Sequence, residues 1–274
     1  MDNTHTHGDL RELGCLAAGI ARQAGALLLE GWRDVHAVGT KSSPSDLVTQ
    51  MDREAEALIR RRIAQARPGD RVLGEEEGES PGDDRRARWI VDPLDGTVNY
   101  FYGLPAWVVS IAVEIDGHVV AGAVNAPALG EDYLAVAGQG SHRRSVGKVE
   151  RLAVSTATDT REALLATGFG YRCERRAAQA RVVAELLPEV RDIRRCGAAA
   201  LDLCWTAGGR VDCYYERGLK LWDWAAGGLI VREAGGVVGG LHGRPGGSEM
   251  VVAAPAPLFT KLSDRLAGLD ADSG

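Results

Sequence analysis

Hydrophobic residues recur at helical spacing in two stretches near the start of the chain. Between residues 10 and 32 the apolar positions fall three or four residues apart, which predicts an amphipathic helix. These positions are Leu10, Leu13, Leu16, Ala17, Ile20, Ala24, Leu27 and Leu28. A polar loop follows, and a second helix is predicted from about Thr49 to Ala66. Its inner face carries Leu58, Ile59 and Ile63.

The middle of the chain has the pattern of a sheet. Strands are predicted at 71–74, 89–91, 107–115, 118–125 and 131–137. Asp116 and Gly117 form a two-residue hairpin signal, which indicates an antiparallel meander. We expect the meander to end at the glycine-rich turn near Gly138 and Gly140. Residues 78–86, rich in Gly, Pro, Ser and charge, predict a mobile surface loop.

The second half of the chain alternates extended and helical patterns. Extended segments are predicted at 162–167, 212–215 and 250–254, and helices at 174–187, 198–207, 222–234 and 258–266. Such alternation is typical of a layered α/β architecture. We therefore expect one domain over residues 10–267, with an α+β half at about 10–145 and an α/β half at about 146–267. The polar residues 1–9 are expected to form a disordered tail.

Composition and charge narrow the class of protein. The 274 residues carry a net charge of -6, which argues against a protein that coats nucleic acid. Five cysteines without a CxxC pair indicate reduced side chains of a cytoplasmic protein and disfavour structural zinc. No window of the sequence is expected to approach the apolar length of a membrane span, and residues 1–9 lack the apolar core of a signal peptide.

Two carboxylates flank a proline in the turn that follows the strand at 89–91. Pro93 restricts the backbone before it and Gly96 permits unusual backbone angles, so Asp92 and Asp95 are expected to lie close together. Two carboxylates about 5 Å apart repel by roughly 3 kcal/mol at an effective dielectric constant near 20. A hard divalent cation offsets such repulsion. The plainer alternative is an exposed turn with solvated acids.

Three further acidic residues lie where a strand ends or a helix begins. Glu75 follows the strand at 71–74, whereas Asp52 and Asp223 fall in the first turns of predicted helices. Each has a plain interpretation, because acidic runs are usually solvated and an acid in a first turn complements the helix dipole. Taken together, however, these are the positions at which layered folds gather site residues.

A pocket that collects four carboxylates requires about two divalent cations. Glu75, Asp92, Asp95 and Asp223 offer only oxygen ligands, which favours Mg²⁺ over zinc. A helix beginning after Gly96 would direct its free N–H groups at an anion, and metals beside an anion site indicate a phosphate.

Thr97 would then pass a proton from an attacking water towards Asp52. Lys41 is a candidate for added positive charge or a solvated surface group.

These motifs resemble the inositol monophosphatase family of Mg²⁺-dependent, lithium-sensitive phosphatases. The similar segments are Gly74-Glu75-Glu76, the run from Asp92 to Asn99, Trp222-Asp223-x-Ala225-Ala226-Gly227, and the run from Lys41 to Thr49 followed by Asp52. The resemblance covers residues 10–267 and is greatest to the actinobacterial SuhB-type members, through the segments 95–105 and 194–204.

The resemblance implies a five-layer αβαβα sandwich, of the type shared with fructose-1,6-bisphosphatase, and a homodimer. It implies that two or three Mg²⁺ ions are held by Glu75, Asp92, the Leu94 carbonyl, Asp95 and Asp223. It assigns phosphate contacts to Asp95, Gly96 and Thr97, water activation to Thr97, Asp52 and Glu75, and substrate contacts to Glu216 and Ala199. Leu94 and Val98 replace the commoner Ile and Thr, and the glycine-rich segment 237–247 does not align clearly.

The leading hypothesis is a Mg²⁺-dependent phosphomonoesterase acting on myo-inositol 1-phosphate or a related polyol or sugar phosphate. The same fold serves histidinol-phosphate phosphatases, fructose-1,6-bisphosphatases and nucleotide and NADP phosphatases, and Glu216 favours a polyol only weakly. A P-loop enzyme is disfavoured because the G-x-x-x-x-G-K-[ST] motif does not occur. From a different class, a catalytically inactive regulatory binding protein would keep the fold alone.

Overall fold

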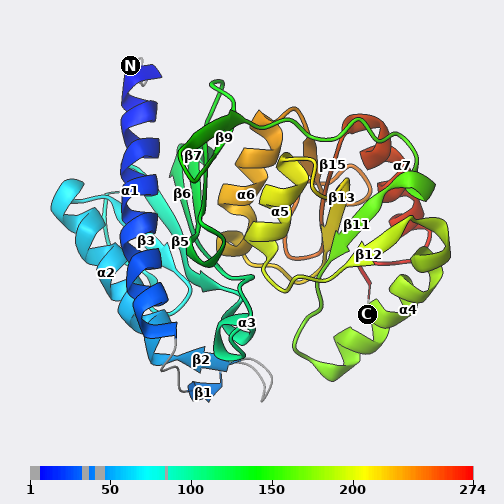
Figure 1. Ribbon diagram of the computed structural model, residues 1–274, viewed down its shortest axis with the longest axis horizontal. Helices are drawn as coiled ribbons and strands as arrows, with labels where there is room; N and C mark the ends of the chain where they lie inside the picture. The colour runs from blue at the N-terminus through cyan, green and yellow to red at the C-terminus, as the bar shows by residue number, and fades with distance from the viewer. Residues whose placement is uncertain (1–6, 33–36, 41–46, 84–85, 274) are drawn as a thin grey trace.

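The chain forms five stacked layers, in the order helices, sheet, helices, sheet, helices (Figure 1). The computed structural model describes residues 7–32, 37–40, 47–83 and 86–273. Three apolar cores lie between the layers, and one of them packs against both sheets through the middle layer. This arrangement confirms the αβαβα sandwich expected from the resemblance.

The first sheet has eight strands in the order β10-β9-β8-β7-β6-β5-β3-β4. Their bounds are β3 (Arg71–Gly74), β4 (Gly78–Glu79), β5 (Arg88–Asp95), β6 (Val108–Ile115), β7 (His118–Ala126), β8 (Glu131–Val136), β9 (Ser141–Ser145) and β10 (Lys148–Arg151). Neighbours pair antiparallel except β3 and β5, which run parallel. A separate pair, β1 (Ala37–Thr40) and β2 (Leu47–Thr49), lies near the end of α1 in Figure 1.

Two long helices cover the outer face of this sheet. They are α1 (His7–Gly31) and α2 (Gln50–Ala66), and their buried apolar positions follow the predicted helical spacing. By length and composition Asp9–Gly31 could cross a membrane, so the prediction that no stretch has that character is wrong. Half of its most apolar window is buried inside the fold, as in the core helix of a globular domain.

The middle layer and second sheet come from the second half of the chain. The sheet has the order β12-β11-β13-β15-β14, and only its β11–β12 and β11–β13 pairs are parallel. The strands are β11 (Leu164–Thr167), β12 (Asp192–Arg194), β13 (Cys213–Glu216), β14 (Val237–Gly239) and β15 (Val251–Ala254). Helices α5 (Ala199–Ala207) and α6 (Leu221–Glu233) lie between the sheets, and α4 (Cys173–Leu186) and α7 (Ala256–Ala267) form the outer layer.

Short helical elements complete the chain, and two strands, β9 and β10, were not predicted. The helical elements are α3 (Thr97–Phe101) and the 3-10 turns at Pro127–Leu129, Thr160–Glu162 and Leu187–Glu189. The meander does not end near Gly140, because β9 and β10 extend it. Their sequences, SHRRS and KVER, lack an apolar face, and β10 lies at the edge of the sheet. Polar edge strands carry little periodic signal.

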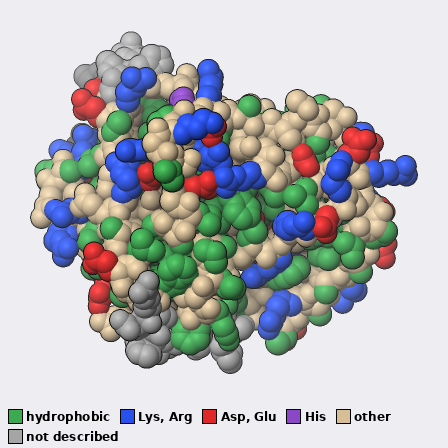
Figure 2. All heavy atoms as spheres, in the orientation of Figure 1, with side chains coloured by type: hydrophobic (Ala, Val, Ile, Leu, Met, Phe, Trp, Pro, Cys, Tyr) green, Lys and Arg blue, Asp and Glu red, His purple; other side chains and the backbone are tan. Residues whose placement is uncertain are grey.

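The face shown in Figure 2 carries acidic and basic side chains intermingled around apolar surface. Among the coloured residues on that face, no continuous basic field is seen of the kind that follows a nucleic-acid backbone. This is consistent with the net charge of -6.

Candidate active site

Strand pairing brings Glu75 and Asp92 to the same edge of the first sheet. In the parallel pair β3–β5, Gly74 is opposite Val91, so the two acids are the next residues on neighbouring strands. Carboxyl ends of parallel strands are where α/β folds place ligand sites. The sequence contained both acids, but only this register puts them side by side.

The segment from Asp92 to Asp95 is a distorted strand rather than a turn beyond the strand's end. Strand β5 continues to Asp95, and its pairing with β6 is irregular between Asp92 and Asp95. Asp92 is 2% exposed, and its Oδ1 accepts a hydrogen bond from the Leu94 amide at 3.0 Å. Gly96 has φ of 94°, and a Cβ there would lie 2.8 Å from the carbonyl oxygen of Ala106.

Thr97 and Asp52 are joined by a hydrogen bond although 45 residues separate them. Thr97 begins α3, as predicted, and its hydroxyl donates to Asp52 Oδ1 at 2.9 Å, with the Leu94 carbonyl oxygen also within 3.1 Å. Asp52 is fully buried, and its Oδ2 accepts from the Thr49 amide at 2.8 Å in the capping box of α2. Asp52 therefore caps its helix and also holds Thr97.

Asp95 connects the first sheet to the middle layer. Its Oδ2 accepts from the Ala200 amide in the first turn of α5 at 2.7 Å. Burial, followed by the nearby charge of Asp223, raises the pKa of Asp95 well above its usual range, and the hydrogen bond from Ala200 opposes that rise. Glu216 and Glu75 add to the rise, so Asp95 is close to three further carboxylates.

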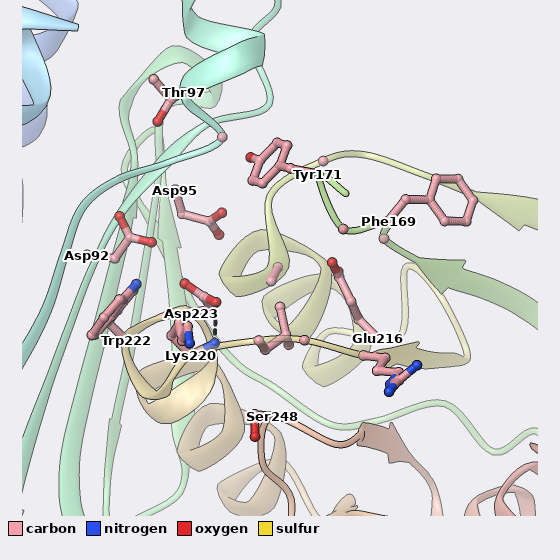
Figure 3. A pocket seen from close by; sticks show the side chains of 18 of the residues that line it. Asp92, Asp95, Thr97, Phe169, Tyr171, Glu216, Lys220, Trp222, Asp223 and Ser248 are labelled. Atoms are coloured by element: carbon pink, nitrogen blue, oxygen red, sulfur yellow. Dashed lines mark hydrogen bonds between the residues drawn. The ribbon is translucent and has the colours of Figure 1, made fainter. Parts of the chain in front are cut away.

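Asp223 approaches the site from the opposite side, at the start of α6 (Figure 3). Its Oδ2 accepts from the Lys220 amide at 2.6 Å, which is the ordinary capping role of an acid in a first turn. In Figure 3 its carboxylate also lies on the pocket side, below Asp95. Capping fixes where the carboxylate lies, so the plain and the functional interpretations are compatible.

Glu216 ends β13 and lies across the pocket from Thr97. The Tyr214 hydroxyl donates to Glu216 Oε2 at 2.8 Å. Burial raises the pKa of Glu216 to about 7, and the Tyr214 hydroxyl and the charge of Arg195 oppose that rise. A Cβ at Gly168 would lie 1.9 Å from Glu216 Oε2, so a larger residue there would displace this carboxylate.

One cavity of about 690 Å³ joins these residues. Its walls include Glu75, Asp92, Leu94, Asp95, Gly96, Thr97, Ala199, Glu216 and Asp223. All predicted site residues therefore line one pocket except Asp52, which contacts it through Thr97. Within the described ranges no group of three or more His, Cys, Asp or Glu is already gathered as a metal ligand set. Like charges keep such acids apart unless a cation joins them.

The chemistry of the walls fits a hard divalent cation. Four of the lining residues are carboxylates at the acidic end, Glu75, Asp92, Asp95 and Asp223, and Leu94 has its backbone there as well. Burial contributes most to the raised pKa of Asp95, and the charges of Asp223, Glu216 and Glu75 add to it. Oxygen donors of this kind suit Mg²⁺, which binds through a few carboxylates and its own waters.

Several pocket residues were not predicted from the sequence. The loop 168–171 contributes Phe169 and Tyr171, and Arg195 lies over the Phe169 ring at 5.9 Å. Arg175, from α4, passes where Gly170 and Gly218 leave room for it. The glycines around Phe169 were a usable signal, whereas the arginines resembled ordinary surface charge. Lys41 lies outside the described residues.

Comparison with known proteins places the chain in a family. The model of the family described as "Inositol monophosphatase family" matches residues 9–268. An inositol-1-monophosphatase from Mycobacterium leprae is 45% identical over 263 residues, covering 90% of each chain. A protein named Nus factor SuhB from Escherichia coli K12 is 39% identical over 263 residues, covering 92% of this chain and 97% of that protein.

A solved structure of Mycobacterium tuberculosis SuhB superimposes with a TM-score of 0.81 at 40% sequence identity. The superposition covers 94% of this chain and 97% of that one. Family match, sequence identity and fold agree over nearly the whole chain. This chain belongs to the inositol monophosphatase family.

Proposed function

We propose that this chain is a Mg²⁺-dependent phosphomonoesterase that releases inorganic phosphate from myo-inositol 1-phosphate or a related polyol phosphate. The observation that carries the proposal is the single pocket lined by Glu75, Asp92, Asp95 and Asp223 beside the Thr97–Asp52 hydrogen bond. The mycobacterial relatives named inositol-1-monophosphatase support the reaction class.

Glu75, Asp92, Asp95, Asp223 and the Leu94 carbonyl would hold two or three Mg²⁺ ions at the acidic end of the pocket. Bound Mg²⁺ would supply charge neutralisation for the phosphate and acidify a nearby water. The walls at Gly96 and Thr97 would hold the phosphate oxygens, with Asp95 beside them. The site would thus place phosphorus between the carboxylates and α3.

The Thr97–Asp52 pair would move the proton. Because the Thr97 hydroxyl donates to Asp52, its oxygen lone pairs are available to a water in the pocket. As that water attacks phosphorus in line with the leaving group, its proton passes to Thr97 Oγ1 and the Thr97 proton passes to Asp52 Oδ1. The bond from phosphorus to the alcohol oxygen breaks, and the leaving alkoxide takes a proton from solvent water. Glu75, which also lines the pocket, would orient the water.

The alcohol would lie at the other end, between Ala199 and Glu216. A carboxylate that already accepts from Tyr214 keeps its other oxygen for substrate hydroxyls. This end favours a polyol over an apolar alcohol. Histidinol phosphate, fructose 1,6-bisphosphate and nucleotide phosphates are the alternative substrates, because enzymes of the same fold act on them.

Phosphate release tests the proposal directly. We expect turnover of myo-inositol 1-phosphate with Mg²⁺, loss of turnover after chelation, inhibition by Li⁺, and a higher kcat/KM than for the three competing ester classes. No turnover of any sugar phosphate at saturating Mg²⁺ would contradict the enzyme assignment. A higher kcat/KM for histidinol phosphate would keep the reaction class and change the substrate.

A regulatory role is the second candidate, because an E. coli relative carries the name Nus factor SuhB. A binding protein that kept only the fold would not need all the acids of the pocket, and here every one is present. The phosphatase is therefore preferred.

We further propose that the protein is a cytoplasmic homodimer. Light scattering of the purified protein would measure its mass and so test the dimer.

A further inference from the structure

Glu56 is a fully buried carboxylate that the proposed chemistry does not use. It lies on α2, four residues after Asp52, so the two acids are on the same face of the helix. Burying a charge costs free energy unless hydrogen bonds and an opposite charge compensate for it. The partners of Glu56 therefore indicate what it is for.

Both carboxylate oxygens of Glu56 bind the turn that carries Glu75. Oε2 accepts from the Glu76 amide at 2.8 Å, and Oε1 accepts from the Glu77 amide at 3.0 Å. The contact is close, because a Cβ at Gly74 would lie 2.2 Å from Oε1. Glycine before Glu75 therefore lets the end of β3 approach the carboxylate.

Arg60 completes this anchor one helical turn later. Its Nε donates to Glu56 Oε1 at 2.8 Å, which neutralises the buried charge. Its other nitrogens reach the carbonyl oxygens of Val72 and Gly78 on the two strands beside the turn. Glu56 and Arg60 thus hold the backbone on both sides of Glu75.

The same helix also fixes Thr97, since Asp52 accepts its hydroxyl. We propose that Glu56 is a positioning residue: through Glu56 and Asp52, α2 sets the place of Glu75 relative to Thr97. The inference rests on the proposed function, in which Glu75 binds Mg²⁺ and Thr97 receives a proton. Outer partners that orient metal ligands are worth about 10- to 100-fold in metal affinity.

The variant Glu56→Gln tests this role. The amide nitrogen of glutamine cannot accept a hydrogen bond, so the hydrogen bond to the amide of either Glu76 or Glu77 is lost. The control is Glu54→Gln, an exposed residue of α2 bonded only to Gln50 among the hydrogen bonds described. In metal-free protein we expect the amides of Glu76 and Glu77 to exchange hydrogen at least about tenfold faster in Glu56→Gln. The control should match wild type.

Calorimetric titration with Mg²⁺, in the absence of substrate, supplies the second measurement. We expect the Kd of Glu56→Gln to rise by about 10- to 100-fold and that of Glu54→Gln to stay within about twofold. Unchanged exchange, or faster exchange with unchanged Kd, overturns the positioning role. If wild type binds no Mg²⁺, the proposed function fails while hydrogen exchange still decides whether Glu56 anchors the turn.

If Glu56→Gln does not fold, Arg60→Lys carries the test, because lysine keeps the charge but removes the Nε donor. Faster exchange at Glu76 and Glu77 together with a weaker Mg²⁺ Kd would support the role. Wild-type values for both would overturn it.

Discussion

Asp52 and Asp223 each cap a helix and also belong to the candidate site. Each accepts a backbone N–H at the start of a helix, from Thr49 and Lys220 respectively. Capping holds the carboxylate in one place, and the remaining oxygen is directed by the helix that it caps. At the helix starts, the sequence predicted only that each acid would complement the dipole of its helix, and it did not predict these capping hydrogen bonds.

Asp95→Asn separates the chemical role of Asp95 from its structural role. The asparagine amide oxygen can still accept from the Ala200 N–H, so the circular dichroism spectrum should not change. Loss of the negative charge should reduce kcat by more than the about 10- to 100-fold that follows loss of an outer partner. The exposed Asp116→Asn is the matched control. Unfolding of Asp95→Asn would mean that the carboxylate is structural.

Asp202 predicts a dependence of stability on pH. Burial raises the pKa of this residue of α5 from 3.8 to about 8, while a hydrogen bond with Cys196 opposes that rise. Between those values the folded chain binds one more proton than the unfolded chain, so the free energy of unfolding falls as pH rises from about 4 to 8.

Asp202→Asn removes this titration, and urea unfolding of both proteins at pH 5 and pH 8.5 measures the difference. We expect wild type to lose more stability than Asp202→Asn over that interval. Equal losses in the two proteins would show that Asp202 ionises similarly in both states.

At the scale of elements, close approach between layers decides where the site residues lie. Gly122 of β7 faces the backbone of α6, and a Cβ there would lie 2.9 Å from the Ala226 carbonyl oxygen. Asp223 is carried by the same helix, one turn earlier. The distance between sheet and helix therefore contributes to the position of a candidate ligand.

Gly122→Ala should destabilise the fold by about 1–3 kcal/mol, because the added methyl group meets backbone that cannot rotate away. Gly19→Ala is the contrasting variant, since nothing lies within 4 Å of a Cβ at Gly19 in α1. It should stabilise the fold by about 0.5–1 kcal/mol through helix propensity. Urea unfolding measures both, and a neutral Gly122→Ala would contradict the close packing.

On the scale of the whole molecule, the core around the middle layer joins the two halves of the chain. Ile90, Val124 and Tyr133 from the first sheet share one apolar cluster with Leu203 and Ile230 from the second half. Neither half can bury these side chains alone. We therefore propose one domain rather than two independent ones.

That proposal predicts a single cooperative unfolding transition. Calorimetric and van't Hoff enthalpies should agree for the full chain, and residues 1–145 alone should give no dispersed amide spectrum by NMR. Two separate transitions, or a folded fragment 1–145, would show that the halves are independent domains.

Local sequence determined most of the regular elements. The helix at 49–66 and the strands at 71–74 and 118–125 match the structure to within a residue. A single buried face fixes the periodicity of the helix and of the strand at 71–74. The residue types alone also indicated that Asp92 and Asp95 belong to one candidate site and that a helix begins after Gly96. The helices, the strands and the helix start after Gly96 depend on residues close in the sequence, so the sequence alone predicts them.

Only the tertiary structure decided which of these residues meet. The register of β3 against β5 places Glu75 beside Asp92, and α6 of the middle layer and β13 of the second sheet bring Asp223 and Glu216 to the same pocket. Strands β9 and β10 were not predicted because both are largely polar, so their sequences have no periodic apolar face, and only pairing with β8 and with each other shows that they are strands. The anchor at Glu56 was hidden for a related reason, since its partners lie 20 and 21 residues away. Residue type sets the chemistry that is available, and long-range packing sets the geometry in which it can act.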